Sequence, residues 1–395
     1  MFRKSALVFL CVFSLTSCFA LKPQRGMEKK IVDRAVDQLG KQVEVIEKSG
    51  KFMNPRTIHN NKTVYVSRED WTSGFFPGSM WYMYELTGDV KWMKYGINYT
   101  TQLESVKFLT KHHDIGFIIN SSYGNAHRIT NDEQYKTVII EAAKSLATRY
   151  RPVPGVIQSW DEDRGWQKER GWMCPVIIDN MMNLELLFTA TRLSGDSTFY
   201  RMAVSHADNT LKNHFRTDYS CYHVVDYDKT NGHVRSRGTA QGYADESSWA
   251  RGQAWALYGF TMCYRETKDK RYLTLAENIY KFLFSHPNMT DDLIPYWDLN
   301  APKIPDEPRD ASAAAVIASA LYELSTFKNK GYKKTADKIM KSLSSSAYLA
   351  APGENGHFLL KHSVGSIPHN SEIDVPLNYA DYYFLEALMR KAKQN

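Results

Sequence analysis

The sequence has few cysteines and none of the spacings that bind a structural metal. Apart from Cys11 and Cys18 near the N-terminus, its 395 residues contain only Cys174, Cys221 and Cys263. Three isolated cysteines do not form the disulfide framework that small exported domains use. Because no CxxC or His-x-x-x-His pattern is present, a structural zinc site is not expected.

Long apolar runs and clusters of one charge are also scarce. After the N-terminus no apolar stretch approaches about 18 residues, and no run of Lys or Arg resembles a nucleic-acid-binding tail. The formal net charge of +7 suits a small anionic ligand, although surfaces that bind nothing often carry as much. With 43% hydrophobic and 24% charged residues, the chain has the composition of a globular protein with one large domain or two ordinary ones.

The N-terminal segment "MFRKSALVFLCVFSLTSCFA" has the features of a secretory signal peptide. Arg3 and Lys4 precede an apolar run that is too short for a dependable membrane span, and small residues follow it. The Leu-Thr-Ser-Cys sequence that ends at Cys18 resembles a bacterial lipobox, which predicts a signal peptide over residues 1–17 and a lipid on Cys18. Ordinary cleavage near Ala20 is the alternative. In both cases we expect an exported protein, either periplasmic or a membrane-anchored bacterial lipoprotein.

One pattern recurs along the rest of the chain: two amphipathic helical runs joined by a short polar turn. The aspartate in this turn is a predicted helix N-cap, because its side chain can accept from free amides of the first turn. These aspartates are Asp89, Asp132, Asp196 and Asp269, and the fifth copy has Asn329 in their place. The spacing of about 43 to 73 residues is too irregular for a tetratricopeptide array.

Loops rich in Trp, Gly, His and Pro separate these copies and lead into the more apolar helix of each pair. The order of loop, inner helix, polar turn and outer helix, with a last apolar helix over 375–390, predicts one all-α domain over 26–395 that closes into a toroid. Strand patterns are limited to 222–228 and 357–364. A toroid gathers the N-terminal ends of its inner helices around one mouth, where their partial positive charge favours an anion.

Two aspartates in these loops are the candidate catalytic residues. Asp179 has apolar neighbours on nearly every side, which should raise its pKa and suits a general acid. The alternative is an ordinary N-cap of a buried helix. Asp114 follows His112 and His113, and its alternative is a loop aspartate paired with a histidine. Two carboxylates facing one pocket are the usual minimum for sugar chemistry.

The segment 237–255, "RGTAQGYADESSWARGQAW", combines cationic, aromatic and polar side chains at the start of a helix. Arg251 and Trp255 are four residues apart and therefore share a helix face. A buried Arg251 needs an anionic partner, either a ligand carboxylate or an internal aspartate. For Trp71, Trp249 and Trp255, core packing is the alternative to a sugar-binding wall.

Together, "HHDIGF", "IIDNMMNL" and "QGYADESSWARGQAWALYGF" resemble the unsaturated glucuronyl hydrolases, family 88 of the glycoside hydrolases. So does the C-terminal "LLKHSVGSIPHNSEIDVPLNYADYYFLEAL". The resemblance implies an (α/α)6 barrel, with Asp179 as general acid/base and Asp114 as the second essential aspartate. It implies substrate contacts at Trp71, His223, Arg237, Thr239, Gln241, Trp249, Arg251 and Trp255, and at Ser363 and Ser366 near the second sugar.

The family's chemistry implies release of the 4,5-unsaturated uronic acid from glycosaminoglycan oligosaccharides that lyases have produced. In this scheme Asp179 protonates C4, water adds at C5, and the resulting hemiketal opens to free the neighbouring sugar. Arg251 is expected to help bind the uronate carboxylate, while Trp249 and Trp255 flank the ring. The resemblance implies no metal and no cofactor. The expected partners are anionic unsaturated oligosaccharides, with no nucleic acid and no membrane contact beyond the lipid anchor.

Three other functions fit the same sequence. A related enzyme would act on unsaturated galacturonyl-rhamnose from pectin, and a conventional glycosidase or lyase on this fold would act on saturated chains. A helical-repeat lipoprotein that only binds carbohydrate is the non-enzymatic alternative; it predicts an open superhelix without a deep pocket.

Overall fold

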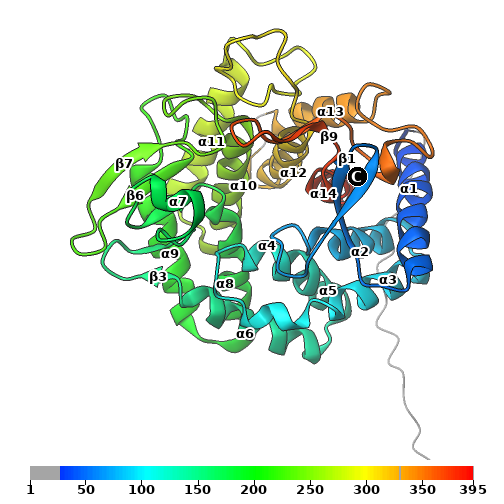
Figure 1. The fold of residues 1–395 in the computed structure, drawn as a ribbon, viewed down its shortest axis with the longest axis horizontal. Helices are drawn as coiled ribbons and strands as arrows, with labels where there is room; N and C mark the ends of the chain where they lie inside the picture. Colours follow the sequence, from blue (N-terminus) through cyan, green and yellow to red (C-terminus); the bar gives the residue numbers. More distant parts are fainter. Residues whose placement is uncertain (1–26, 329–330, 395) are drawn as a thin grey trace, which may run out of the picture.

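The computed structural model describes residues 27–328 and 331–394, in which helices alternate between an inner and an outer ring (Figure 1). The inner ring comprises α2 (Phe75–Thr87), α4 (Ile115–Ile119) continued by the π-helical η2 (Asn120–Gly124), α8 (Asn180–Ser194), α10 (Ala250–Thr267), α12 (Ala311–Phe327) and α14 (Asn378–Lys393). The outer ring comprises α1 (Met27–Ser49), α3 (Val90–Thr101), α6 (Glu133–Ala147), α9 (Ser197–Asn213), α11 (Lys270–Ser285) and α13 (Tyr332–Leu343).

Each inner helix contacts its inner neighbours, and α14 packs against α2 to close the ring. The inner helices are buried on all sides: α12 has no exposed residue from Ala311 to Leu324. The outer helices bury one stripe only, as in α13, where Tyr332, Ala336 and Ile339 face inward. This arrangement is the (α/α)6 barrel, and it confirms the predicted all-α toroid.

The polar turns between inner and outer helices end in the predicted caps. The side chains of Asp89, Asp132, Asp196 and Asp269 each accept a hydrogen bond from the backbone N–H two residues later, at the starts of α3, α6, α9 and α11. In the fifth copy, Asn329 lies outside the described residues. The N-cap position of α13 belongs to Gly331, whose φ of 82° places it in the left-handed region.

Short antiparallel strands occupy the loops that lead to the inner helices. They are β1 (Asn54–His59) with β2 (Lys62–Val66), β3 (Tyr150–Arg151) with β4 (Val156–Ile157), β5 (Pro175–Ile177) with β6 (Val224–Tyr227) and β7 (Val234–Gly238), and β8 (Ser363–Ser366) with β9 (Ser371–Val375). The strand pattern at 222–228 corresponds to β6, whereas the pattern at 357–364 overlaps β8 only at Ser363 and Val364. The remaining short elements are η1 (Glu104–Phe108), α5 (Asn125–Thr130), α7 (Gly165–Glu169) and η3 (Asn355–His357).

The three cysteines of the barrel are buried and unpaired. Burial raises the pKa of the Cys174 thiol to about 12, so it is a packed apolar side chain and not a reactive thiolate. Across residues 27–328 and 331–394, every helix is too short or too polar to cross a membrane. The predicted signal peptide and Cys18 lie outside the described part of the chain.

Candidate active site

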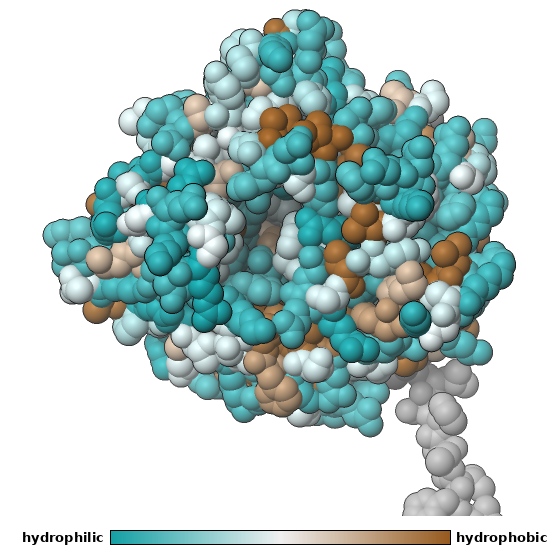
Figure 2. Space-filling view, viewed as in Figure 1, coloured by the Kyte–Doolittle hydropathy of each residue, from teal (hydrophilic) through white to brown (hydrophobic). Residues whose placement is uncertain are grey.

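The starts of the inner helices surround a hollow on one face of the barrel (Figure 2). Trp71 lies just before α2, and Asp114, Asp179, Trp249 and Asp310 occupy the N-cap positions of α4, α8, α10 and α12. The loops that the sequence separates by tens of residues therefore meet at one mouth, as the toroid predicts.

Asp114 and Asp179 differ from the other aspartates at helix starts. Neither side chain makes a capping hydrogen bond, although each residue occupies an N-cap position. Asp310, in the same position on α12, accepts from the amides of Ser312 and Ala313. Capping therefore does not explain Asp114 or Asp179, and both carboxylates are available for other contacts.

Burial raises the pKa of the Asp179 carboxyl to about 7, against the opposing attraction of Arg251 and with a further increase from the charge of Asp114. Its Oδ2 atom is buried and has no hydrogen-bond partner among the described residues. Asp179 thus carries a proton at mildly acidic pH and can exchange it close to neutrality, as an acid/base catalyst must.

His223 supplies a hydrogen-bond donor beside Asp179. Its Nδ1 accepts from the backbone amides of Ala240 and Gln241 at 3.1 and 3.2 Å, so the neutral ring carries its proton on Nε2. That Nε2 lies 3.7 Å from Asp179 Oδ2. Burial, together with the positive charge of Arg251, holds the pKa of His223 well below its ordinary value, so the ring is a neutral donor.

Asp114 lies between two histidines. Its Oδ1 is 3.3 Å from His113 Nε2, and its Oδ2 is 3.4 Å from His112 Nδ1. Burial alone would raise the pKa of Asp114, but His113, His112 and the nearby Arg149 lower it below its ordinary value. The mouth therefore contains an ionised carboxylate, Asp114, and a carboxylic acid, Asp179. Asp114 is suited to an electrostatic role and Asp179 to proton transfer.

Arg251 is held by groups of the protein itself. It is 3% exposed, and its Nη1 lies 3.2 Å from Asp310 Oδ2. It also donates to the carbonyls of Val364 and Gly365 and to Gln241 Oε1. The sequence left two possible anionic partners for Arg251, a ligand carboxylate or an internal aspartate. In the structure an internal aspartate, Asp310, is its partner. These contacts tie Arg251 to the walls of the mouth, and its contact with a uronate carboxylate stays a prediction.

Of the three predicted tryptophans, one is partly exposed and two are buried. Trp71 is partly exposed and lies against Tyr379, with ring centroids 4.9 Å apart. Trp249 is buried beside His223 at 4.6 Å, and the Arg251 guanidinium lies 4.6 Å from its ring. Trp255 is fully buried, so in this structure it is part of the core and not an exposed wall for a sugar ring.

The other residues predicted to contact substrate differ in their exposure to solvent. Thr239 is near His223, with Oγ1 3.5 Å from its Nδ1. Arg237 is exposed on β7 and donates to the Asn213 carbonyl, so the structure does not bring it to the two aspartates. Ser363 is fully buried, whereas Ser366 lies 2.7 Å from His369 Nδ1 in the hairpin of β8 and β9.

Sequence reasoning missed the aromatic wall of the mouth. Trp160, Trp166 and Trp172 form one cluster, in which Trp160 meets the edge of the His223 ring at 6.0 Å. Trp166 reaches His369 at 5.1 Å. Three tryptophans in "WDEDRGWQKERGW" were a visible signal for it.

The chain is similar in sequence and in structure to known unsaturated glucuronyl hydrolases. Residues 47–390 match the sequence model of Glycosyl Hydrolase Family 88. An unsaturated glucuronyl hydrolase of Formosa agariphila is 49% identical over 339 residues, which cover 85% of this chain and 82% of that protein. An unsaturated chondroitin disaccharide hydrolase of Streptococcus agalactiae is 31% identical, with 93% and 92% covered. A crystal structure of an unsaturated glucuronyl hydrolase specific for heparin superposes with a TM-score of 0.88 at 47% identity, covering 93% of this chain and 97% of that one.

Proposed function

The chain belongs to glycosyl hydrolase family 88, and we propose that it releases the 4,5-unsaturated uronic acid from the non-reducing end of glycosaminoglycan oligosaccharides. The substrate class is that of its relatives, one named for unsaturated chondroitin disaccharides and one described as specific for heparin. Such ends arise when a lyase cleaves a uronate-containing chain.

The reaction begins with proton transfer to the double bond. Asp179, protonated below about pH 7, donates its proton to C4, and positive charge develops at C5 and the ring oxygen. The ionised Asp179 then accepts a proton from a water molecule while the oxygen of that water bonds to C5. The hemiketal opens by breaking the bond between C5 and the ring oxygen. This leaves a hemiacetal at C1. The bond between C1 and the glycosidic oxygen then breaks, and the second sugar leaves with that oxygen.

Asp114 and His223 support this proton transfer from two sides. The ionised Asp114 stabilises the positive charge that develops on the ring and can hold its hydroxyls. The Nε2–H of His223 faces Asp179 and can donate to its carboxylate after the proton has left. The observation that carries the proposal is the pairing of Asp179, whose pKa is about 7, with Asp114, whose pKa is lowered.

A panel of unsaturated chondroitin, hyaluronan and heparin disaccharides, with and without sulfate, tests the proposal. Hydration destroys the conjugated double bond, so loss of its ultraviolet absorbance reports turnover directly. We expect turnover of at least one of these disaccharides. Turnover of unsaturated galacturonyl-rhamnose alone would establish the pectin activity, and turnover of saturated chains alone would establish a conventional glycosidase or lyase.

The activity is expected to depend on pH as a bell with its optimum on the acid side of neutrality. The raised pKa of Asp179 means that the general acid loses its proton as the pH rises through about 7, and kcat/KM falls there. The lowered pKa of Asp114 keeps that carboxylate ionised at the optimum, and its protonation at lower pH gives the acid limb. A profile that is flat from about pH 5 to 9 would contradict a carboxyl acid/base.

We further propose that the protein is exported and carries lipid on Cys18, so that it acts in the periplasm or on a membrane surface. The lipobox-like sequence before Cys18 supports this location. Cell fractionation of the Cys18→Ser variant tests it: the variant should lose membrane association while the wild type keeps it. Equal distribution of both would favour ordinary cleavage near Ala20.

A further inference from the structure

The hairpin of β8 and β9 has an irregular backbone. Asn370, Glu372 and Asp374 have φ values of 48°, 55° and 54°, a left-handed conformation that residues other than glycine rarely adopt. The pairing register also shifts between Ser363 and Val364. Left-handed residues other than glycine are strained, so contacts with the rest of the protein help to keep this hairpin in shape.

This hairpin forms part of the wall of the mouth. The carbonyls of Val364 and Gly365 accept from Arg251, which ties β8 to the start of α10. At the turn, His369 contacts Trp166 of the aromatic wall. If the proposed function holds, the leaving sugar lies against this aromatic wall, which extends from His223 to the turn of the hairpin.

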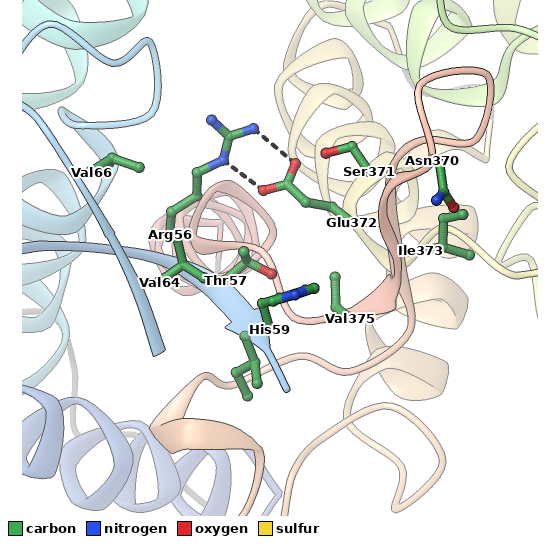
Figure 3. A pocket seen from close by; sticks show the side chains of 11 residues that line it. Arg56, Thr57, His59, Val64, Val66, Asn370, Ser371, Glu372, Ile373 and Val375 are labelled. Atoms are coloured by element: carbon green, nitrogen blue, oxygen red, sulfur yellow. Dashed lines mark hydrogen bonds and ion pairs between the residues drawn. The ribbon is translucent and has the colours of Figure 1, made fainter. Parts of the chain in front are cut away.

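A bidentate ion pair joins the hairpin to the other end of the chain. Arg56 on β1 donates from Nε and Nη2 to the two carboxylate oxygens of Glu372, at 2.6 and 2.8 Å (Figure 3). The same guanidinium donates from Nη1 to Asp70 at 2.9 Å, next to Trp71. The side chains of Arg56 and Glu372 are 21% and 11% exposed, so water screens this pair only partly.

Little else connects the two hairpins at this point. A cavity of about 620 Å³ lies between them, lined by aliphatic side chains such as Val66 and Val375 (Figure 3). Just after β9, the Pro376 carbonyl accepts from Thr57 Oγ1, and Asn378 Nδ2 donates to the Pro55 carbonyl of β1. The bidentate pair therefore bridges a gap that apolar packing leaves open.

The position of Glu372 is coupled directly to the strand that faces the mouth. A Cβ atom on Gly365 would lie 2.5 Å from Glu372 Oε2, so the carboxylate rests against the glycine backbone. Gly365 is also the residue whose carbonyl accepts from Arg251 at 2.6 Å. Movement of Glu372 would thus shift the segment between Ser363 and Ser366.

We propose that the Arg56–Glu372 pair is a latch that holds the β8–β9 hairpin in place to receive the leaving sugar. Arg56 and Glu372 are then positioning residues for the second sugar, and they do not take part in the proton transfer. The inference rests on the proposed function, because it assigns a role to one wall of the same site.

Two substrates separate this role from a general structural one. Glu372→Gln and Arg56→Lys keep the side-chain size close to the original but remove the bidentate charged pair. With an unsaturated disaccharide, each variant is expected to raise KM about tenfold while kcat stays within about threefold. With the methyl glycoside of the unsaturated uronic acid, which has no second sugar, KM is expected to stay within about twofold.

Asp374→Asn is the matched control. Asp374 is two residues further along β9, is also left-handed and forms an exposed pair with His362, but it does not contact Arg56. This variant should behave as wild type on both substrates. Equal KM changes on both substrates, an unchanged KM on the disaccharide, or the same effect in Asp374→Asn would overturn the latch. Failure of the wild type on both substrates would instead reject the proposed function.

Discussion

Replacement of Asp179 by asparagine is expected to lower kcat on an unsaturated disaccharide by a factor of about 10² to 10⁴ or more. The amide keeps the volume of the side chain and its position before α8, but it cannot donate and recover a proton. The pKa of about 7 shows that the wild-type carboxyl exists in both protonation states near neutrality, which the amide cannot reproduce. Steady-state kinetics at the pH optimum measure the loss.

Folding is the control for this variant. Because the folded-state pKa of Asp179 is raised above its unfolded value, ionisation of this carboxyl weakens the fold as the pH rises toward 7. The neutral amide avoids that loss, so at about pH 8 the variant should melt at or above the wild-type temperature.

Asp132→Asn makes the same substitution at an ordinary N-cap, where asparagine caps as well as aspartate. It should leave activity unchanged. Retention of more than about a tenth of wild-type activity in Asp179→Asn would remove Asp179 from the acid/base role.

Replacement of Arg251 is expected to lower both the stability and the activity of the protein. Arg251→Ala leaves Asp310 buried without its cation, which typically costs about 3 to 5 kcal/mol of unfolding free energy. Arg251→Lys keeps the charge, but one ammonium group cannot serve Asp310, Gln241 and the carbonyls of Val364 and Gly365 together. We expect the lysine variant to lose most of the same stability and at least about tenfold in kcat/KM.

Denaturant unfolding and kcat/KM on the same preparations measure both effects. Arg271→Lys is the matched control, because the Arg271 side chain is 57% exposed and pairs with Asp269, which is 31% exposed. Such a pair contributes about 1 kcal/mol or less, so this variant should resemble the wild type. An Arg251→Lys protein within about threefold of wild-type activity and with unchanged stability would show that these hydrogen bonds do not hold the mouth together.

The sequence was most informative where short-range chemistry determines the structure. The N-cap at Asp196 depends on an amide two residues away, and the alternation of inner and outer helices depends on local apolar spacing. The raised pKa of Asp179 likewise follows in large part from its burial among apolar neighbours in the same segment. These features were all predictable before any tertiary contact was known.

Features that depend on distant residues were not predictable in the same way. Arg251 finds its anion in Asp310, 59 residues along the chain, and no local pattern indicates that pairing. Arg56 and Glu372 are 316 residues apart and meet only because the barrel closes. Trp255 carries the same sequence signal as a sugar-binding tryptophan, yet packing against Phe117 and Tyr383 buries it. Local sequence thus identified the acid/base candidate, whereas the walls around it required the fold.

In the proposed reaction Asp179 delivers a proton to C4 and water adds at C5, without attack at the anomeric carbon. Turnover of an unsaturated disaccharide in D2O, followed by NMR from the first minutes, tests it most directly. We expect one deuterium at C4 of the released uronic acid, added to a single face, and we expect that Asp179→Asn does not produce this signal. Release of a uronic acid that keeps its C4=C5 double bond, with no deuterium at C4, would contradict it.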